Sequence, residues 1–441
     1  MNCFKSQEGL IRRFKEKQMR GAPPAERPFF RKESTMKKIT VSTPVTVAQS
    51  TTEPVLFGGY QLPHIRIDEK KTLYVQFMGR KDSVETYGAE EKDHYYLSRD
   101  AGETWERTNR TAWEGAAKKL PNGDILSFRQ HTPVRDLPPL PPTDRVTTVF
   151  GERRIYTVEE LTPLLGDRVE KEFKAVRIPA GETEPQEENC HVHWKNMPVT
   201  YIPAAGTLVR TMMHMDNLTA DKNGVLWATV YGFGVDGDGR LLSPFHAVHL
   251  LRSEDMGHNW HYVSTVTYKE EYNRPTHPAC VEGFNEAAIL LPDDGSIVLV
   301  LRTGSLHPRQ IGDEAHPAPM LYIVRSADGG KSWEDIKPFY DFGVSPVAAR
   351  MGDSFLLSSG RPGVYLRTAD AATAREWSKP HFLVRVPEED FYSAYFEHSC
   401  SNTDLAVYDE STAFIAYSDF KRPAPDGYPA KSIMVAKITL S

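Results

Sequence analysis

Short apolar runs alternate with polar turns in six places along the chain, each with the pattern of a β-hairpin. In each place a turn of two to four residues separates two strand-like runs. Helical periodicity is sustained almost nowhere, and residues 157–165 (TVEELTPLL) are the best candidate for a helix. The hairpins begin at Arg66, Lys119, Tyr201, Leu290, Ala349 and Val407.

A second repeat, S-x-D-x-G-x-x-W, follows several of these hairpins. It occurs without gaps at residues 98–105, 253–260 and 326–333, and a longer variant without the glycine occupies residues 368–377. The pattern fits a tight turn in which Asp accepts backbone N–H groups, Gly takes a positive φ, and Trp packs on the sheet. Together the two repeats predict an all-β protein of six four-stranded modules. A six-bladed β-propeller would close the sheet edges that an open array leaves exposed.

Two regions depart from this rhythm. Residues 133–190 contain Pro-Pro pairs, which do not fit a central strand, followed by a charged run without alternation. We expect an inserted loop region there, acting as a lid or oligomer contact or forming a disordered surface excursion. Residues 1–38 hold eleven Lys or Arg against four Asp or Glu, and we expect residues 1–45 to be a basic, disordered arm. Residues 46–441 would then form the propeller.

Composition narrows the class of protein further. The 441 residues are 40% hydrophobic and 25% charged, with a formal net charge of −6, as in an ordinary soluble globular protein. This mild acidity argues against nucleic acid or an anionic membrane as a partner. Cys3, Cys190, Cys280 and Cys400 are spaced too widely for a metal or redox motif.

The N-terminal residues are basic but lack the apolar core of a secretory signal. We therefore expect a cytoplasmic location, with Met36 (MKKITV) as an alternative start of the chain.

The S-x-D-x-G-x-x-W turns resemble the Asp boxes, or BNR repeats, of the sialidase superfamily. From about Val55 to the C-terminus the chain resembles the six-bladed propeller of that superfamily. The resemblance implies that Asp100, Asp255 and Asp328 form outer turns, and that the ligand site lies on the axis. It also implies a site in which three arginines bind an acidic group, a Tyr–Glu pair supplies the nucleophile, and an Asp is the acid/base.

Two positions match the pattern of this superfamily. In NEAAILLPDDGSIVLVLRTG, Glu286 opens one strand of a hairpin and Arg302 ends the other, like the superfamily's Glu and second arginine. In SSGRPGVYLRT, Arg361 falls where the third arginine would lie. The resemblance therefore implies a catalytic role for Glu286 and substrate binding by both arginines.

Other positions depart from the pattern. Gln61-Leu62-Pro63 stands where the first arginine is expected, with Arg66 close by as a substitute. Asp82 or Glu85 is the candidate acid/base in the loop after the first hairpin. Asn402 aligns with the nucleophilic tyrosine, which leaves Tyr392, upstream, as the candidate nucleophile.

These residues predict an exo-glycosidase that hydrolyses a terminal acidic sugar, such as sialic acid or a uronic acid, without a cofactor or metal. If Tyr392 does not reach the axis, water would be the nucleophile. One alternative is a propeller polysaccharide lyase using His131, His191 or His193, since His191 and His193 would face one side of a strand. Another is a non-catalytic glycan-binding propeller, which the departures at Gln61 and Asn402 favour. The expected partner is a carbohydrate with an anionic group.

Overall fold

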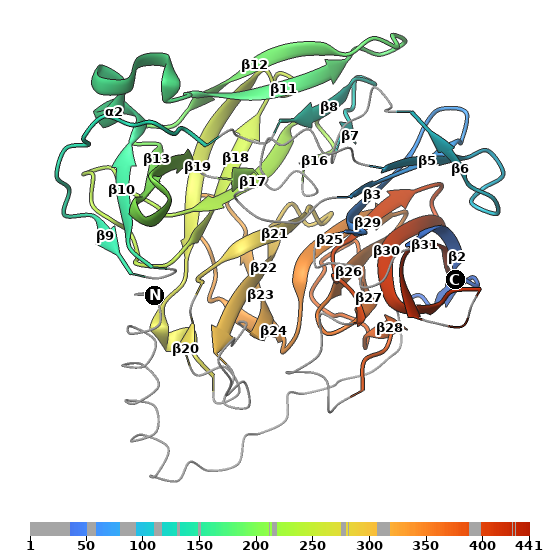
Figure 1. Ribbon diagram of the computed structural model, residues 1–441. Coiled ribbons are helices and arrows are strands. Elements are labelled where there is room, and N and C mark those ends of the chain that lie inside the picture. The colour runs from blue at the N-terminus through green and yellow to red at the C-terminus, as the bar shows by residue number, and fades with distance from the viewer. Residues whose placement is uncertain are drawn as a thin grey trace, which may run out of the picture.

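The computed structural model describes residues 36–50, 59–79, 94–109, 117–129, 133–148, 151–210, 212–213, 218–274, 279–280, 282–306, 318–387, 398–425, 427 and 429–441. Within these ranges the chain is built mostly of antiparallel strands, as the alternating pattern predicted. The sheets follow one another around the molecule in chain order, with the first and last strands of the chain on the same side (Figure 1).

Sheets 1 to 3 come from the first part of the chain. Sheet 1 contains β3 (Gln61–Ile67), β4 (Leu73–Met78), β5 (His94–Ser98) and β6 (Glu106–Thr108). Sheet 2 contains β7 (Lys118–Lys119), β8 (Ile125–Phe128), β11 (Glu172–Ile178) and β12 (Gln186–His193). Sheet 3 contains β15 (Met212–Met213), β16 (Thr219–Ala220), β17 (Leu226–Gly232), β18 (Ala247–Ser253) and β19 (Asn259–Thr267). Sheets 2 and 3 join into one nine-stranded sheet because β12 pairs with β19 in parallel.

Sheets 4 to 6 come from the second part. Sheet 4 contains β20 (Ala279–Cys280), β21 (Asn285–Leu290), β22 (Ile297–Leu306), β23 (Ala318–Ser326) and β24 (Lys337–Tyr340). Sheet 5 contains β25 (Val344–Met351), β26 (Ser354–Gly360), β27 (Val364–Asp370) and β28 (His381–Val384). Sheet 6 contains β29 (Thr403–Val407), β30 (Thr412–Pro423) and β31 (Pro429–Leu440), with β1 (Ile39–Val41) and β2 (Val45–Gln49) on β31.

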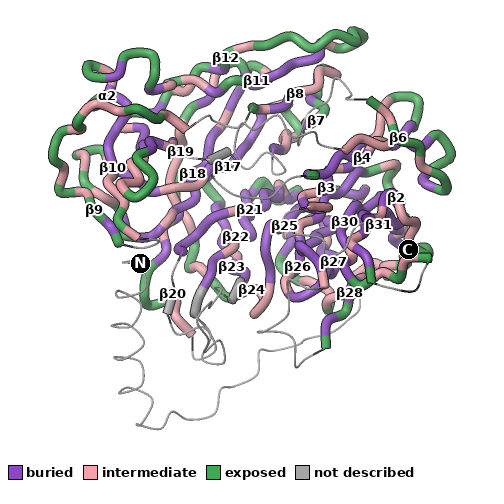
Figure 2. The backbone as a smooth tube through the Cα atoms, viewed as in Figure 1, coloured by how far each residue is buried: buried purple, intermediate pink, exposed green. Residues whose placement is uncertain are grey.

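Sheets 3 to 6 and sheet 1 touch one another through strands of their hairpins. β17 contacts β21, β21 contacts β25, β25 contacts β29, and β29 contacts β3 of sheet 1. Sheet 1 meets sheet 2 through an ion pair of 3.0 Å between Glu69 and Lys119. Apolar side chains fill the space between neighbouring sheets, and the buried positions follow the strands while exposed ones gather at the turns (Figure 2).

The three S-x-D-x-G-x-x-W turns join the last two strands of sheets 1, 3 and 4. In the first turn Ser98 Oγ donates to Asp100 Oδ1 over 2.7 Å and accepts the Gly102 amide over 2.9 Å. Asp100 Oδ1 also accepts the Thr104 amide over 2.9 Å. Equivalent hydrogen bonds recur around Asp255 and Asp328. The predicted turn is confirmed.

The glycine of each turn is required for a second reason, close approach to the preceding sheet. Gly102, Gly257 and Gly330 have φ values of 88°, 89° and 82°. A Cβ on Gly257 would lie 2.8 Å from Leu126 of sheet 2, and one on Gly330 would lie 2.3 Å from Leu250 of sheet 3. Each turn therefore packs one sheet onto the one before it.

Five of the six predicted hairpins connect the first two long strands of a sheet, and the third does not. Its strands, β13 (Pro198–Ile202) and β14 (Thr207–Arg210), pair with β10 (Arg153–Thr157) and β9 (Val146–Thr147) in a separate sheet, which we call the inserted sheet. In sheet 3 the corresponding hairpin is β16–β17, around the turn Asp221–Gly224.

The expectation of an inserted loop over residues 133–190 is partly wrong. β11 and β12 form a regular hairpin of sheet 2, with β11 paired to β8. The rest includes the inserted sheet and helix α2 (Val158–Leu165), where helical periodicity was expected. Thr157 caps α2 by accepting the Glu160 amide, and Glu160 accepts the Thr157 amide. Short 3₁₀ turns lie at Gly166–Arg168, Pro203–Ala205 and Glu270–Tyr272.

The expected arm also ends earlier than residue 45. β1 pairs with the end of β31, from Ile39 opposite Leu440 to Val41 opposite Ile438, and β2 follows on the same strand. Residues 1–35 lie outside the described part of the chain. No helix in the described part is both long and apolar enough to span a bilayer.

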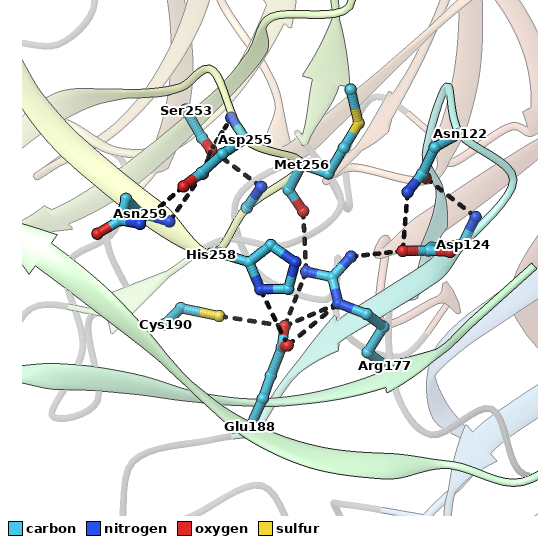
Figure 3. Close-up of polar contacts among 11 residues, drawn as sticks. Asn122, Asp124, Arg177, Glu188, Cys190, Ser253, Asp255, Met256, His258 and Asn259 are labelled. Atoms are coloured by element: carbon cyan, nitrogen blue, oxygen red, sulfur yellow. Dashed lines mark hydrogen bonds and ion pairs between the residues drawn. The ribbon is translucent and has the colours of Figure 1, made fainter.

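A buried arginine strengthens the junction of sheets 2 and 3 (Figure 3). Arg177 of β11 binds both carboxylate oxygens of Glu188 over 2.8 to 3.1 Å and Asp124 Oδ2 over 2.9 Å. Its Nη2 also donates to the Met256 carbonyl, in the S-x-D-x-G-x-x-W turn of sheet 3, over 2.8 Å. His258 of the same turn lies 3.2 Å from Glu188.

Candidate functional site

The first hairpin strands of sheets 1, 4, 5 and 6 begin at one common end, which we call the rim. The first residue of each of these strands pairs with a residue of the second strand: Gln61 with Met78, Asn285 with Arg302, Val344 with Gly360, and Thr403 with Tyr417. Because first strands of successive sheets touch one another, rim residues of different sheets come together.

Glu286 and Arg302, which the sequence placed on the two strands of one hairpin, form an ion pair at this rim. Arg302 Nη1 lies 2.7 Å from Glu286 Oε1, and both side chains are nearly enclosed. The other carboxylate oxygen, Glu286 Oε2, accepts the amide of Ser345 in sheet 5 over 2.8 Å. Glu286 is thus held from its own sheet by a guanidinium and from the next sheet by the backbone.

Glu282 is a second carboxylate on the same arginine, and the sequence reasoning missed it. Its Oε2 lies 3.4 Å from Arg302 Nη2 and accepts the Asn285 side-chain amide over 3.1 Å. Burial of Arg302 acts to lower its pKa, but the charges of Glu286 and Glu282 outweigh this effect and raise the pKa above its usual value. The arginine is therefore fixed as a cation between two carboxylates.

The backbone before β21 fixes Glu282 against sheet 3. His246 donates its amide to the Glu282 carbonyl over 3.0 Å, and Phe284 donates to the His246 carbonyl over 2.9 Å. A Cβ on Gly283 would lie only 2.4 Å from the His246 carbonyl oxygen, so only glycine fits. Burial, with the charges of Arg153 and Arg302, lowers the pKa of His246 to about 4, which keeps its imidazole neutral at pH 7.

Arg361 also lies at the rim, directly after the last residue of β26. Its backbone has a φ of 61°, the peptide bond to Pro362 is cis, and its Nη2 donates to the Cys400 carbonyl over 3.4 Å. The structure brings Arg361 to the same end of the molecule as Glu286 and Arg302.

A further group of charged residues gathers where sheets 6, 1 and 2 meet. Asp404 is the second residue of β29, and its side chain is only 3% exposed. Its carboxylate accepts the amides of Ile65 over 3.1 Å and Leu405 over 2.8 Å. His64 Nδ1 lies 3.7 Å from one oxygen and Lys118 Nζ lies 3.8 Å from the other. We call Asp404, His64 and Lys118 the Asp404 cluster.

The remaining predicted residues fall into two sets. Arg66 lies in β3 opposite Tyr74 and is buried, and Gln61 is the buried first residue of the same strand. His191 and His193 lie on β12, at the junction with β19 and far along sheet 2 from its first strand. Asp82, Glu85, Tyr392 and His131 lie outside the described residues.

Two findings concern other kinds of site. Within the described ranges, no three or more His, Cys, Asp or Glu side chains are grouped so that they could hold a metal ion. An open groove of about 510 Å³ lies beside the inserted sheet, lined by Arg145, Glu160 and Asp238 among others. There Arg145 already binds both oxygens of Glu160 and the Gly239 carbonyl.

No protein-family model matches the chain, and no curated protein resembles it in sequence. Among solved structures, a protein of unknown function from Dyadobacter fermentans is 17% identical with a TM-score of 0.55, covering 91% of this chain and 99% of that one. A Hadza microbial sialidase is 13% identical with a TM-score of 0.46, covering 85% of this chain and 65% of that one. An α-L-arabinanase of Penicillium chrysogenum, complexed with arabinobiose, is 16% identical with a TM-score of 0.46, covering 90% of this chain and 98% of that one.

The similarity to the Dyadobacter protein shows a shared fold over almost the whole of both chains. Sialidases are among the solved structures that the comparison finds. At these identities the likeness concerns the fold and says nothing about activity.

Proposed function

We propose that the protein is a six-bladed β-propeller. Sheets 1 to 6 supply six blades if the nine-stranded sheet is divided at its one parallel pair, β12 with β19. The contacts of hairpin strands from sheet 3 through sheet 6 to sheet 1 support a closed ring. The inserted sheet would then lie outside the ring.

We further propose that the protein is an exo-glycosidase that hydrolyses a terminal acidic sugar, with its site at the rim. The observation that supports this best is the Glu286–Arg302 pair of 2.7 Å, in which a carboxylate is held from two sheets. In this role Glu286 stabilises the positive charge of an oxocarbenium-like transition state or activates a nucleophile. Asp82 or Glu85 would protonate the leaving oxygen, and Tyr392 or water would be the nucleophile.

Of the two arginines expected to bind the acidic group of the substrate, we propose that Arg361 does so. Arg302 is paired with Glu282 and Glu286, and in the proposed site it holds these two carboxylates in place. Arg66 remains a candidate for binding because it lies on the first strand of sheet 1. We also retain the proposal of a cytoplasmic location.

The test is a screen of purified protein against sialosides, uronides and uronate-containing polysaccharides. For the substrate found, Glu286→Gln and Arg302→Met should each lower kcat/KM by about 100-fold or more, because charge stabilisation in the transition state is lost. The matched control is Glu106→Gln with Arg99→Met, since this ion pair lies on the exposed face of sheet 1.

Full activity of the Glu286→Gln variant would contradict the assignment of Glu286. An unsaturated product that absorbs in the ultraviolet would identify a lyase instead. Binding of glycans without turnover would identify a non-catalytic glycan-binding protein.

A further inference from the structure

Two groups of charged side chains lie at the rim, and their balance of charge differs. In the first group the guanidinium of Arg302 contacts two carboxylates, those of Glu282 and Glu286. In the Asp404 cluster one carboxylate faces both Lys118 and His64. Carboxylates therefore outnumber cations around Arg302, whereas beside Asp404 the Lys118 ammonium can still attract an anion.

The two groups occupy equivalent places in the fold. Glu286 is the second residue of β21, and Asp404 is the second residue of β29. Each side chain reaches the next sheet and accepts a backbone amide there, from Ser345 and from Ile65. Because the sheets repeat the same strand order, this equivalence places both groups at the same end of the molecule.

The carboxylate of Asp404 accepts hydrogen bonds from the backbone and none from the Lys118 ammonium group. It is almost fully buried and accepts two backbone amides, over 2.8 and 3.1 Å. At 3.8 Å the Lys118 ammonium is too far away for a hydrogen bond, although the charges attract each other. Within the described residues Lys118 Nζ donates no hydrogen bond, and its side chain is 24% exposed. The N–H groups of this ammonium can therefore donate to a bound anion.

We propose that Lys118 binds the acidic group of the substrate and that Asp404 is its positioning residue. This inference rests on the proposed function. An anion brought to Arg302 would meet two carboxylates on the same guanidinium, and their repulsion would oppose binding. An anion brought to Lys118 meets a compact positive charge whose one carboxylate neighbour is already satisfied by backbone amides.

The test compares Lys118→Met with Lys119→Met on two substrates: the acidic sugar found in the screen, and its methyl ester. Lys119 is the matched control because it is the next residue of β7, is exposed, and pairs with Glu69. Lys118→Met should raise KM for the acid by about 10- to 100-fold, the loss of one charge-assisted hydrogen bond. It should leave KM for the uncharged ester unchanged, and Lys119→Met should change neither.

Asp404→Asn tests the positioning role. It should raise KM for the acid and leave KM for the ester and both kcat values near those of the unmodified protein. A purely structural role would instead lower kcat for both substrates together. Equal effects of Lys118→Met on acid and ester would overturn the proposal, as would equal effects of Lys118→Met and Lys119→Met.

The inference can fail independently of the proposed hydrolysis, because binding does not require turnover. Calorimetric titration with free glucuronate and free N-acetylneuraminate should show binding to the unmodified protein and to Lys119→Met. The affinity should be about 10- to 100-fold weaker for Lys118→Met. Absence of binding to the unmodified protein, or equal affinity for all three proteins, would contradict the role of Lys118.

Discussion

Glycines in the turns between the last two strands of a sheet meet two separate requirements, a positive φ and close packing against the neighbouring sheet. Gly329 and Gly330 are neighbours in one such turn, with φ values of 74° and 82°. A Cβ on Gly329 would meet nothing within 4 Å, whereas one on Gly330 would lie 2.3 Å from Leu250. The backbone conformation is common to both glycines, but only Gly330 also lies against the neighbouring sheet.

Substitutions at Gly329 and Gly330 separate the cost of a positive φ from the cost of contact with the neighbouring sheet. Gly329→Ala should lower the free energy of unfolding by about 1 kcal/mol, the cost of a positive φ for a residue with a Cβ. Gly330→Ala should lower it by about 1 to 3 kcal/mol more, because Leu250 must also move. Chemical denaturation of both variants measures the difference. Equal losses would show that contact with Leu250 adds nothing.

At the scale of elements, the most informative feature is the parallel junction of β12 with β19. Parallel pairing needs no hairpin, so two antiparallel sheets that are each complete can merge at their last strands. Arg177 stabilises this junction from sheet 2 by contacts with Glu188, Asp124 and the Met256 carbonyl of sheet 3 (Figure 3). Its side chain is only 6% exposed, so its charge depends on these partners.

Arg177→Met should therefore destabilise the protein by about 3 to 5 kcal/mol, because it removes the buried guanidinium that Glu188 and Asp124 share. The control is Arg129→Met, which removes an exposed ion pair with Glu187 on the same sheet. That variant should lose less than about 1 kcal/mol. Melting temperatures from calorimetry check both, and equal shifts would contradict a role of burial.

At the scale of the whole molecule, the N-terminal and C-terminal strands close the last sheet together. β1 and β2 pair with β31, and β29 of the same sheet contacts β3. The inserted sheet docks on sheet 3, where Ile155 of β10 packs with Phe233 and Val235. Close to this contact, His249 is fully buried, with its Nδ1 2.8 Å from Thr265 Oγ1.

His249 should make the stability of the molecule depend on pH. Burial lowers the pKa of His249 to about 3, below the usual 6.5. Between these two pH values the imidazole binds a proton in the unfolded chain but not in the folded protein. Stability should be constant above about pH 6.5 and fall as the pH drops from there toward 3, by at most about 1.4 kcal/mol per pH unit for this group.

The His249→Asn variant should show a shallower fall over the same range, whatever its stability at pH 7. Urea denaturation at several pH values measures the slope. As a control, His258→Asn removes an exposed imidazole beside Glu188 and should leave the part of the slope due to burial in place. An unchanged slope in His249→Asn would contradict the assignment to His249.

Local patterns were sufficient to predict much of the fold. Alternation and turn residues predicted the hairpins, because a strand buried on one face repeats every two residues and a tight turn restricts its residue types. The helix at Val158–Leu165 was expected from its periodicity. The hairpin pattern placed Glu286 and Arg302 on neighbouring strands, but their ion pair emerged only from the structure.

The sequence by itself therefore determined most of the strands and the turns between them, and it placed Glu286 and Arg302 on one hairpin. Only the tertiary structure decided that Glu172–His193 is a regular hairpin, in which the charged residues Arg177 and Glu188 pair with each other at the junction with the neighbouring sheet. It also decided that Glu282 shares Arg302 and that Asp404 meets Lys118 and His64. Asp404 lies 286 positions from Lys118, and no local pattern encodes a contact made by closing sheets upon one another.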